Sequence, residues 1–226
     1  MKKLTRIAPA TTSTPRRPGR DTDTERRILD AAHTVFLQRG TAGARMQDIA
    51  REAGVNQALL HYYFRSKDRL SEAVFRRAAT QLFRSVIEVL ASGAALEDKV
   101  ARVVQLEIDH LLRAPNLPGY ILSELTHHPE RARQLISMLT GSAPEDIRQR
   151  VLATLRREID EAVRAGTMRE ISPEQFMVNL ISLCIFPFAA RPMLGALLGL
   201  DEHGFERFIA KRRQTLAPFF LRALRP

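Results

Sequence analysis

The sequence has little of several residue types: one cysteine (Cys184), no tryptophan and only 6% aromatic residues. A single cysteine excludes both an internal disulfide framework and a cysteine-rich zinc site. Residues 1–20 contain no Asp or Glu and lack the apolar run of a secretory signal. No stretch of useful length alternates polar and apolar residues with the two-residue period of a β-strand. We therefore expect a helical, cytoplasmic protein.

Positive charge is in excess, with 35 Lys and Arg against 25 Asp and Glu and a formal net charge of +10. Residues 1–70 hold most of this excess, because they contain 14 Lys and Arg against 7 Asp and Glu. A surplus of this size indicates an anionic partner, either a nucleic acid or a membrane. Residues 1–20 are basic and rich in Ser, Thr and Pro, so the sequence predicts a disordered basic arm over residues 1–22.

Apolar residues recur at helical spacing from Asp23 onward, and Gly40 predicts a helix end after Arg39. The sequence predicts an all-α fold, with a small domain over 23–70 and a larger helical domain over 71–226. The expected helices span residues 23–39, 46–53, 57–63, 67–90, 96–113, 118–126, 131–139, 144–165, 173–189, 192–198 and 205–224.

Residues 46–65, MQDIAREAGVNQALLHYYFR, fit two helices joined by a tight turn. Gly54 stands at the turn, where a left-handed backbone suits glycine, and the small Ala50 permits a close helix crossing. The other positions that must face the inside of the helix pair are all apolar: Ile49, Ala53, Val55, Leu60 and Tyr63. This is a helix-turn-helix pattern, and the alternative is an ordinary helical hairpin.

In a helix-turn-helix the second helix enters the major groove of DNA with its N-terminal residues on the base edges. Gln57 is suited to adenine, whereas Ala58 and Leu59 are suited to a thymine methyl group. His61 and Tyr62 lie further along the helix and are suited to phosphate contacts. Lys67, behind the N-cap Ser66, begins the next helix and is also expected at a phosphate. The predicted DNA-binding residues are Arg45, Asn56, Gln57, Ala58, Leu59, His61, Tyr62 and Lys67.

Residues 27–40, the helix pair above and FRSKDRL (Phe64–Leu70) together resemble the TetR/AcrR family of bacterial transcriptional regulators. Three residues depart from the family's usual pattern: Asn56 replaces Ser, His61 replaces Tyr, and Ala44 replaces Thr. Arg45, which follows Ala44, is expected to supply a further DNA contact. The resemblance implies a homodimer on a palindromic operator, released by a small-molecule effector. Repressor rather than activator is the family's usual role.

The basic arm has two interpretations beside such a DNA-binding domain. Arg16, Arg17 and Arg20 either enter the minor groove next to the site or belong to a solvated tail that adds only non-specific affinity.

The resemblance places an effector pocket among the helices after residue 70. Mostly apolar residues with a few polar groups suit a small, largely apolar ligand. Core packing explains the apolar ones equally well, and a surface or ion-paired position explains the two charged or titratable ones. The predicted lining residues are Phe83, Leu106, His110, Tyr120, Ile121, Glu124 and Phe176.

The stretch Phe176–Leu200 contains only one charge, Arg191. A transmembrane helix is long enough to fit, but Pro187 and Pro192 interrupt it and Arg191 would lie inside it. A buried core helix is a second interpretation. A helix that both fills the core and forms the dimer contact is the prediction, because a helix apolar all round needs partners on both sides.

Two Glu-x-x-His pairs, Glu107 with His110 and Glu124 with His127, have the spacing of di-iron ligands in helical bundles. Pro129 ends the second pair's helix, and we predict neither a metal nor another cofactor. An enzyme with an accessory DNA-binding segment is an alternative, but no nucleophile–base pair or phosphate loop supports it. A second alternative is a nucleoid-type protein that binds DNA without sequence preference.

Overall fold

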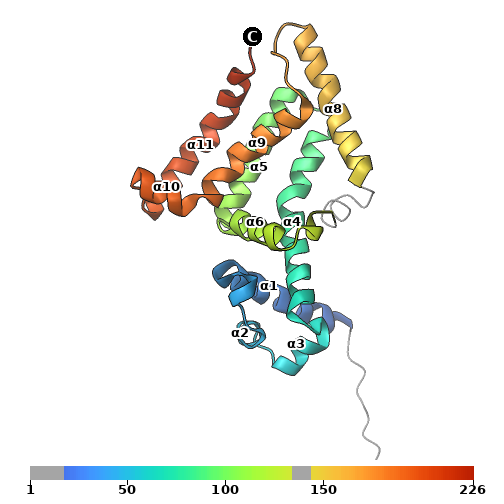
Figure 1. Cartoon of the computed structure of the whole chain (residues 1–226), viewed down its shortest axis with the longest axis vertical. Coiled ribbons are helices and arrows are strands. Elements are labelled where there is room, and N and C mark those ends of the chain that lie inside the picture. The colour runs from blue at the N-terminus through green and yellow to red at the C-terminus, as the bar shows by residue number, and fades with distance from the viewer. Residues whose placement is uncertain (1–17, 134–143) are drawn as a thin grey trace, which may run out of the picture.

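The structure, a computed structural model, describes residues 18–133 and 144–226. Most of the predicted arm (residues 1–17) and part of a predicted helix (residues 134–139) lie outside these ranges. Residues 130–133 are helical, and every other regular element in the described ranges is also a helix, which confirms the all-α prediction. The labelled helices in Figure 1 are α1 (Pro18–Gly43), α2 (Met46–Glu52), α3 (Gln57–Phe64), α4 (Lys67–Leu90), α5 (Leu96–Arg113), α6 (Leu117–His127), α8 (Pro144–Arg164), α9 (Pro173–Ala189), α10 (Arg191–Leu198) and α11 (Glu202–Ala223).

The first helix begins earlier than the sequence predicts. α1 starts at Pro18, so residues 18–22 are helical and the predicted end of the arm at residue 22 is wrong. Proline is preorganised for a first helical turn, and the acidic Asp23 and Glu25 suit the positive end of the helix dipole. Asp23 also pairs with Arg26 at 2.6 Å. The helical backbone breaks at Gly40, at φ 67°, close to the predicted helix end.

α1, α2 and α3 pack together at one end of the molecule, and the long α4 runs from them into the larger domain (Figure 1). Ile28, Phe36 and Ile49 are buried in the core of this small unit, together with Leu60 of α3 and Leu70 of α4. We call α1–α3 with the first turns of α4 the head. Because α4 belongs to both units, any change in its direction moves the head relative to the rest of the chain.

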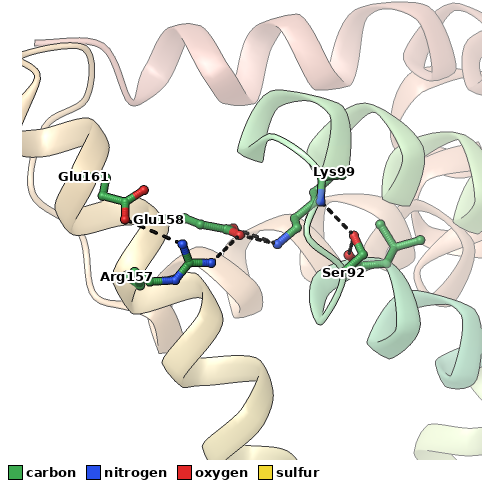
Figure 2. Close-up of polar contacts among 7 residues, drawn as sticks. Ser92, Lys99, Arg157, Glu158 and Glu161 are labelled. Atoms are coloured by element: carbon green, nitrogen blue, oxygen red, sulfur yellow. Dashed lines mark hydrogen bonds and ion pairs between the residues drawn. The ribbon is translucent and has the colours of Figure 1, made fainter.

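Among the described residues of the larger domain, one charged side chain has no exposed area, that of Lys99 on α5. Its ammonium bonds both carboxylate oxygens of Glu158 on α8, at 2.8 and 2.7 Å (Figure 2). Arg157 approaches the same carboxylate at 3.6 Å and also pairs with Glu161. Such a pair is costly to break from one side, since the remaining charge stays buried. The pair therefore fixes α8 against α5.

α9 and α11 each bury one apolar face, whereas α10 has no buried residue, and all three helices leave apolar side chains exposed. α9 buries Phe176, Leu180 and Cys184, yet Val178 and Phe186 remain more than half exposed. This explains the nearly uncharged sequence of the region, because both faces of α9 are apolar. Of the ten exposed large hydrophobic side chains in the described ranges, six lie on these three helices: Val178, Phe186, Met193, Leu197, Leu198 and Phe219.

No single helix in the described residues is long and apolar enough to cross a membrane. α9 and α10 reach that composition only when taken together, and they meet at a 72° bend. Arg191 lies at this bend and stacks over the Phe205 ring of α11 at 4.8 Å, so its charge is accommodated within the fold.

Candidate nucleic-acid interface

The turn between α2 and α3 depends on a glycine and on an arginine from α1. Gly54 has φ 62°, and a Cβ added to it would lie 3.1 Å from Arg27 Nη2. That guanidinium donates to the Ala53 carbonyl at 2.7 Å and to the Gly54 carbonyl at 3.4 Å. Arg27 therefore donates hydrogen bonds to turn carbonyls that no helical backbone N–H reaches. Its role was not predicted, because its partners lie 26 and 27 residues away in the sequence.

α3 begins at a well-formed cap and presents one face outward. Asn56 Oδ1 accepts from the Leu59 backbone N–H at 2.7 Å, so the asparagine caps the helix as the sequence predicts. Leu60 and Phe64 anchor the inner face in the core. The opposite face exposes four predicted DNA-binding residues: Gln57, Ala58, His61 and Tyr62.

Leu59, the remaining residue of α3 predicted to contact a base, is only partly exposed. It lies between the buried Leu60 and the exposed Ala58, at the edge of the outer face. Its assignment to a thymine methyl group stays a prediction.

Basic side chains flank this outer face. Arg45 is exposed at the start of α2, where its backbone caps the helix without a side-chain bond. Lys67 lies half-buried at the start of α4, and its ammonium contacts the carbonyls of Ala42 and Ala44 at 3.4 and 3.3 Å. Lys67 therefore also supports the α1–α2 connection, a role that the sequence did not indicate.

Arg65 is a further exposed base at the end of α3, and no prediction singled it out. It is the one non-glycine residue of the described ranges with a positive φ, 51°. Its backbone N–H bonds the His61 carbonyl at 2.9 Å. The strained backbone turns the chain sharply from α3 into α4 and leaves the guanidinium beside the outer face.

The seven residues predicted to line the effector pocket differ in burial. Tyr120, Ile121 and Phe176 are buried, Phe83 and His110 are half-buried, and Leu106 of α5 is exposed by 36%. The Tyr120 ring stacks on Phe36 of α1 with centroids 6.5 Å apart, so it lies at the contact with the head.

Glu124 is in an ion-paired position. Its carboxylate accepts from Thr41 Oγ1 at 2.6 Å and forms a very short contact with Arg131 Nη1. The second terminal nitrogen of Arg131 donates to Ser71 Oγ at 2.9 Å. Glu124, Arg131 and Ser71 are all buried. This network joins α6 to the end of α1 and the start of α4, which is where the head meets the larger domain.

Three cavities of the larger domain, all among described residues, lie elsewhere. One of about 870 Å³ and one of about 560 Å³ follow α8, and they share Arg156, Asp160 and Arg164. Another of about 530 Å³ lies beside α10. None of these three is lined by the seven predicted effector residues, so the assignment of those residues to an effector stays a prediction.

The two Glu-x-x-His pairs that have the spacing of metal ligands differ in their contacts. Glu124 is engaged by Arg131, whereas His127 is exposed and bonds the Ser123 carbonyl at 2.7 Å. Glu107 and His110 each bury one side-chain atom without a hydrogen-bond partner. Across the residues that the structure describes, no group of three or more His, Cys, Asp or Glu side chains could hold a metal ion.

Burial is the main cause of the pKa shifts of Glu107 and His110 on α5. It raises the pKa of the Glu107 carboxyl to about 8 and lowers the pKa of His110, with Arg113 adding to the second effect. On α9, burial and the nearby Glu107 raise the pKa of the Cys184 thiol to about 12. Glu107 is therefore uncharged near neutral pH, and Cys184 is an unreactive thiol.

The protonated Glu107 predicts a pH-dependent stability. In the unfolded chain the Glu107 carboxyl loses its proton above its ordinary pKa, whereas in the folded chain it keeps the proton up to about pH 8. Between these two pKa values the unfolding free energy therefore falls as the pH rises. Between about pH 6.5 and about pH 8 the loss should be about 1–2 kcal/mol, measured by urea unfolding. Glu107→Gln should remove this slope. Parallel profiles for the variant and the wild type would contradict the assignment.

Comparison with known proteins agrees with this geometry. Residues 28–74 match the family model of bacterial regulatory proteins, tetR family, and residues 97–217 match that of the tetracyclin repressor-like C-terminal domain. The transcriptional repressor NicS of Pseudomonas putida is 27% identical over 77% of this chain and 80% of its own length. The regulator BetI of Brucella suis is 34% identical over 35% of this chain and 40% of its own length.

Solved structures give the same fold. A putative fatty acid metabolism regulator of Clostridium perfringens superposes with a TM-score of 0.62 at 17% identity, over 88% of this chain and 98% of that chain. The two family models together cover most of the head and most of the larger domain. The chain belongs to the TetR family of DNA-binding bacterial transcriptional regulators.

Proposed function

We propose that the chain is a homodimeric repressor that binds a palindromic operator and is released from it by a small, largely apolar effector. The outer face of α3 is the observation that carries this proposal. Leu60 and Phe64 anchor the inner face of α3 in the core. The exposed Gln57 and Ala58 therefore lie at the N-terminal end of the helix, the end that reaches base edges.

The second copy follows from the size of the reading surface and from the exposed apolar side chains. One helix-turn-helix reads only a few base pairs, so specific binding requires two heads on a symmetric site. The six exposed apolar side chains on α9, α10 and α11 form the surface that we assign to the partner copy. We call it the α9–α11 surface. Burying it between two identical chains would form an isologous contact.

The effector belongs in the larger domain, where several polar atoms are buried without partners. Glu107 Oε2 and His110 Nε2 on α5 and the Tyr120 hydroxyl on α6 have no hydrogen-bond partner among the described residues. Each such atom costs about 1–3 kcal/mol. A largely apolar molecule with matching polar groups would recover part of this cost, and its binding would favour one position of α4 and hence of the head.

Substitutions in the head test the DNA-reading assignment. Gln57→Ala should reduce discrimination at one base pair of each half-site by about 1–3 kcal/mol, whereas Lys67→Ala should weaken all sites about equally and lower the salt dependence. Electrophoretic mobility shifts on a panel of single-base operator variants measure both effects. Because Lys67 also supports Ala42 and Ala44, its variant is first checked for an unchanged unfolding midpoint. Equal losses for Gln57→Ala across the panel would contradict base reading.

A further inference from the structure

One backbone carbonyl of α9 has lost its helical partner. Pro187 lies inside α9 and has no N–H, so it cannot donate to the carbonyl of Leu183 one turn earlier. Pro187 is buried, so water does not readily take the place of that donor. By contrast, Pro218 interrupts α11 at an exposed position, next to solvent.

Arg212 of α11 supplies the missing donors. Its Nε lies 3.1 Å and its Nη2 lies 2.8 Å from the Leu183 carbonyl oxygen, so two N–H groups converge on one acceptor. The side chain is partly buried, and burial lowers the pKa of the guanidinium. The fixed fork of an arginine suits this geometry, whereas the single ammonium of a lysine does not.

The bond lies in the middle of the contact between two antiparallel helices. Phe176 of α9 packs edge-on against Phe220 of α11 at 5.2 Å, and Phe188 packs against Phe205 at 5.7 Å. Leu183 lies between Phe176 and Phe188 along α9, and Arg212 lies between Phe205 and Phe220 along α11, so the bond falls between the two aromatic contacts. Aromatic rings tolerate small sliding movements, but a two-donor bond to one carbonyl does not. The polar contact therefore resists sliding of α9 along α11, in addition to the packing of both helices on α5.

We propose that Arg212 is a positioning residue for dimerisation: it replaces the donor absent at Pro187 and holds α9 and α11 in the register that presents the α9–α11 surface to a second copy. Phe186 is adjacent to Pro187, and Phe219 lies two turns beyond Arg212, so a slip between the helices would displace these two exposed side chains relative to each other. The inference rests on the proposed homodimer.

A double-mutant cycle with the full chain tests this assignment. Arg212→Met should raise the dimer dissociation constant, measured by analytical ultracentrifugation, by about tenfold or more, because the Leu183 carbonyl loses every donor. In a Pro187→Ala background residue 187 again has a backbone N–H. There Arg212→Met should raise the dimer dissociation constant by less than about threefold. Arg212→Lys should be intermediate and serves if Arg212→Met does not fold. Equal effects in both backgrounds, or no effect in either, would overturn the proposal.

A neighbouring arginine provides the matched control. Arg213 pairs with Asp109 of α5 at 2.8 Å on the surface, so Arg213→Met should change the dissociation constant by less than about twofold. A larger change would overturn the specific role of Arg212. A wild-type chain that stays monomeric at all concentrations would overturn the dimer instead. In that case the urea midpoints of the wild type, Arg212→Met, Pro187→Ala and the double variant still decide whether Arg212 replaces the donor missing at Pro187, since that coupling requires no second copy.

Discussion

Replacing Arg131 with methionine is expected to lower the unfolding free energy by about 3–5 kcal/mol, measured by urea denaturation. The guanidinium pairs with Glu124 and bonds Ser71 Oγ at 2.9 Å, and it lies over the Phe75 ring at 5.8 Å. Without it the Glu124 carboxylate stays buried, with only Thr41 to bond it. A buried charge without its partner costs far more than the pair itself contributes.

Two further variants separate the lost partner from a general loss of packing. The double variant Arg131→Met, Glu124→Leu removes both charges and should recover most of the lost stability, since apolar replacements of buried pairs are often neutral. Arg77→Met is the matched control, because Arg77 of α4 pairs with Asp30 of α1 at 2.6 Å but near the surface, and the Arg131 network contacts these two helices as well. It should cost less than about 1 kcal/mol. Equal losses for Arg77→Met and Arg131→Met would contradict the burial argument.

Introducing a charge at Phe186 is expected to abolish dimerisation and specific operator binding together. Phe186→Glu should raise the dimer dissociation constant by about thirtyfold or more, the effect of losing a central aromatic contact of about 2 kcal/mol. Operator affinity should fall by at least as much, because a monomer places one head where the palindrome offers two half-sites. Sedimentation and mobility shift on the same samples measure both quantities.

Leu122 is the matched control for this variant. It is exposed by 53%, against 54% for Phe186, but it lies on α6 outside the α9–α11 surface. Leu122→Glu should leave the oligomeric state and operator affinity within about twofold of the wild type, since surface substitutions away from contacts have small effects. If Leu122→Glu were monomeric while Phe186→Glu stayed dimeric, the α9–α11 surface would not be the dimer contact.

The elements of the head could be predicted because their signals are local. Asn56 and Ser66 each accept a bond from the backbone N–H three residues later, as their positions before helices predict. Gly40 and Gly54 both have the positive φ that their places at a helix end and a turn require. The apolar spacing also assigns Leu60 to the core without any knowledge of its neighbours.

The polar groups that join distant elements could not be predicted in the same way. Arg27, Lys99 and Arg131 read as ordinary surface charges in the sequence, and their partners lie 26, 59 and 7 residues away or more. The sequence leaves Glu124 as either a pocket-lining residue or an ion-paired one, and the approach of Arg131 decides its environment. Periodicity identifies which face is buried, whereas the identity of the buried partner depends on tertiary packing.

The most direct test of the account compares the purified chain's affinity for one palindrome from the DNA upstream of its own gene with its affinity for a scrambled duplex of equal length and composition, at fixed salt. Sequence-reading by the outer face of α3 predicts a ratio of about a thousandfold or more, carried by a dimer. A ratio near one, for every palindrome in that region, would contradict it and would favour a protein that binds DNA through its charge alone.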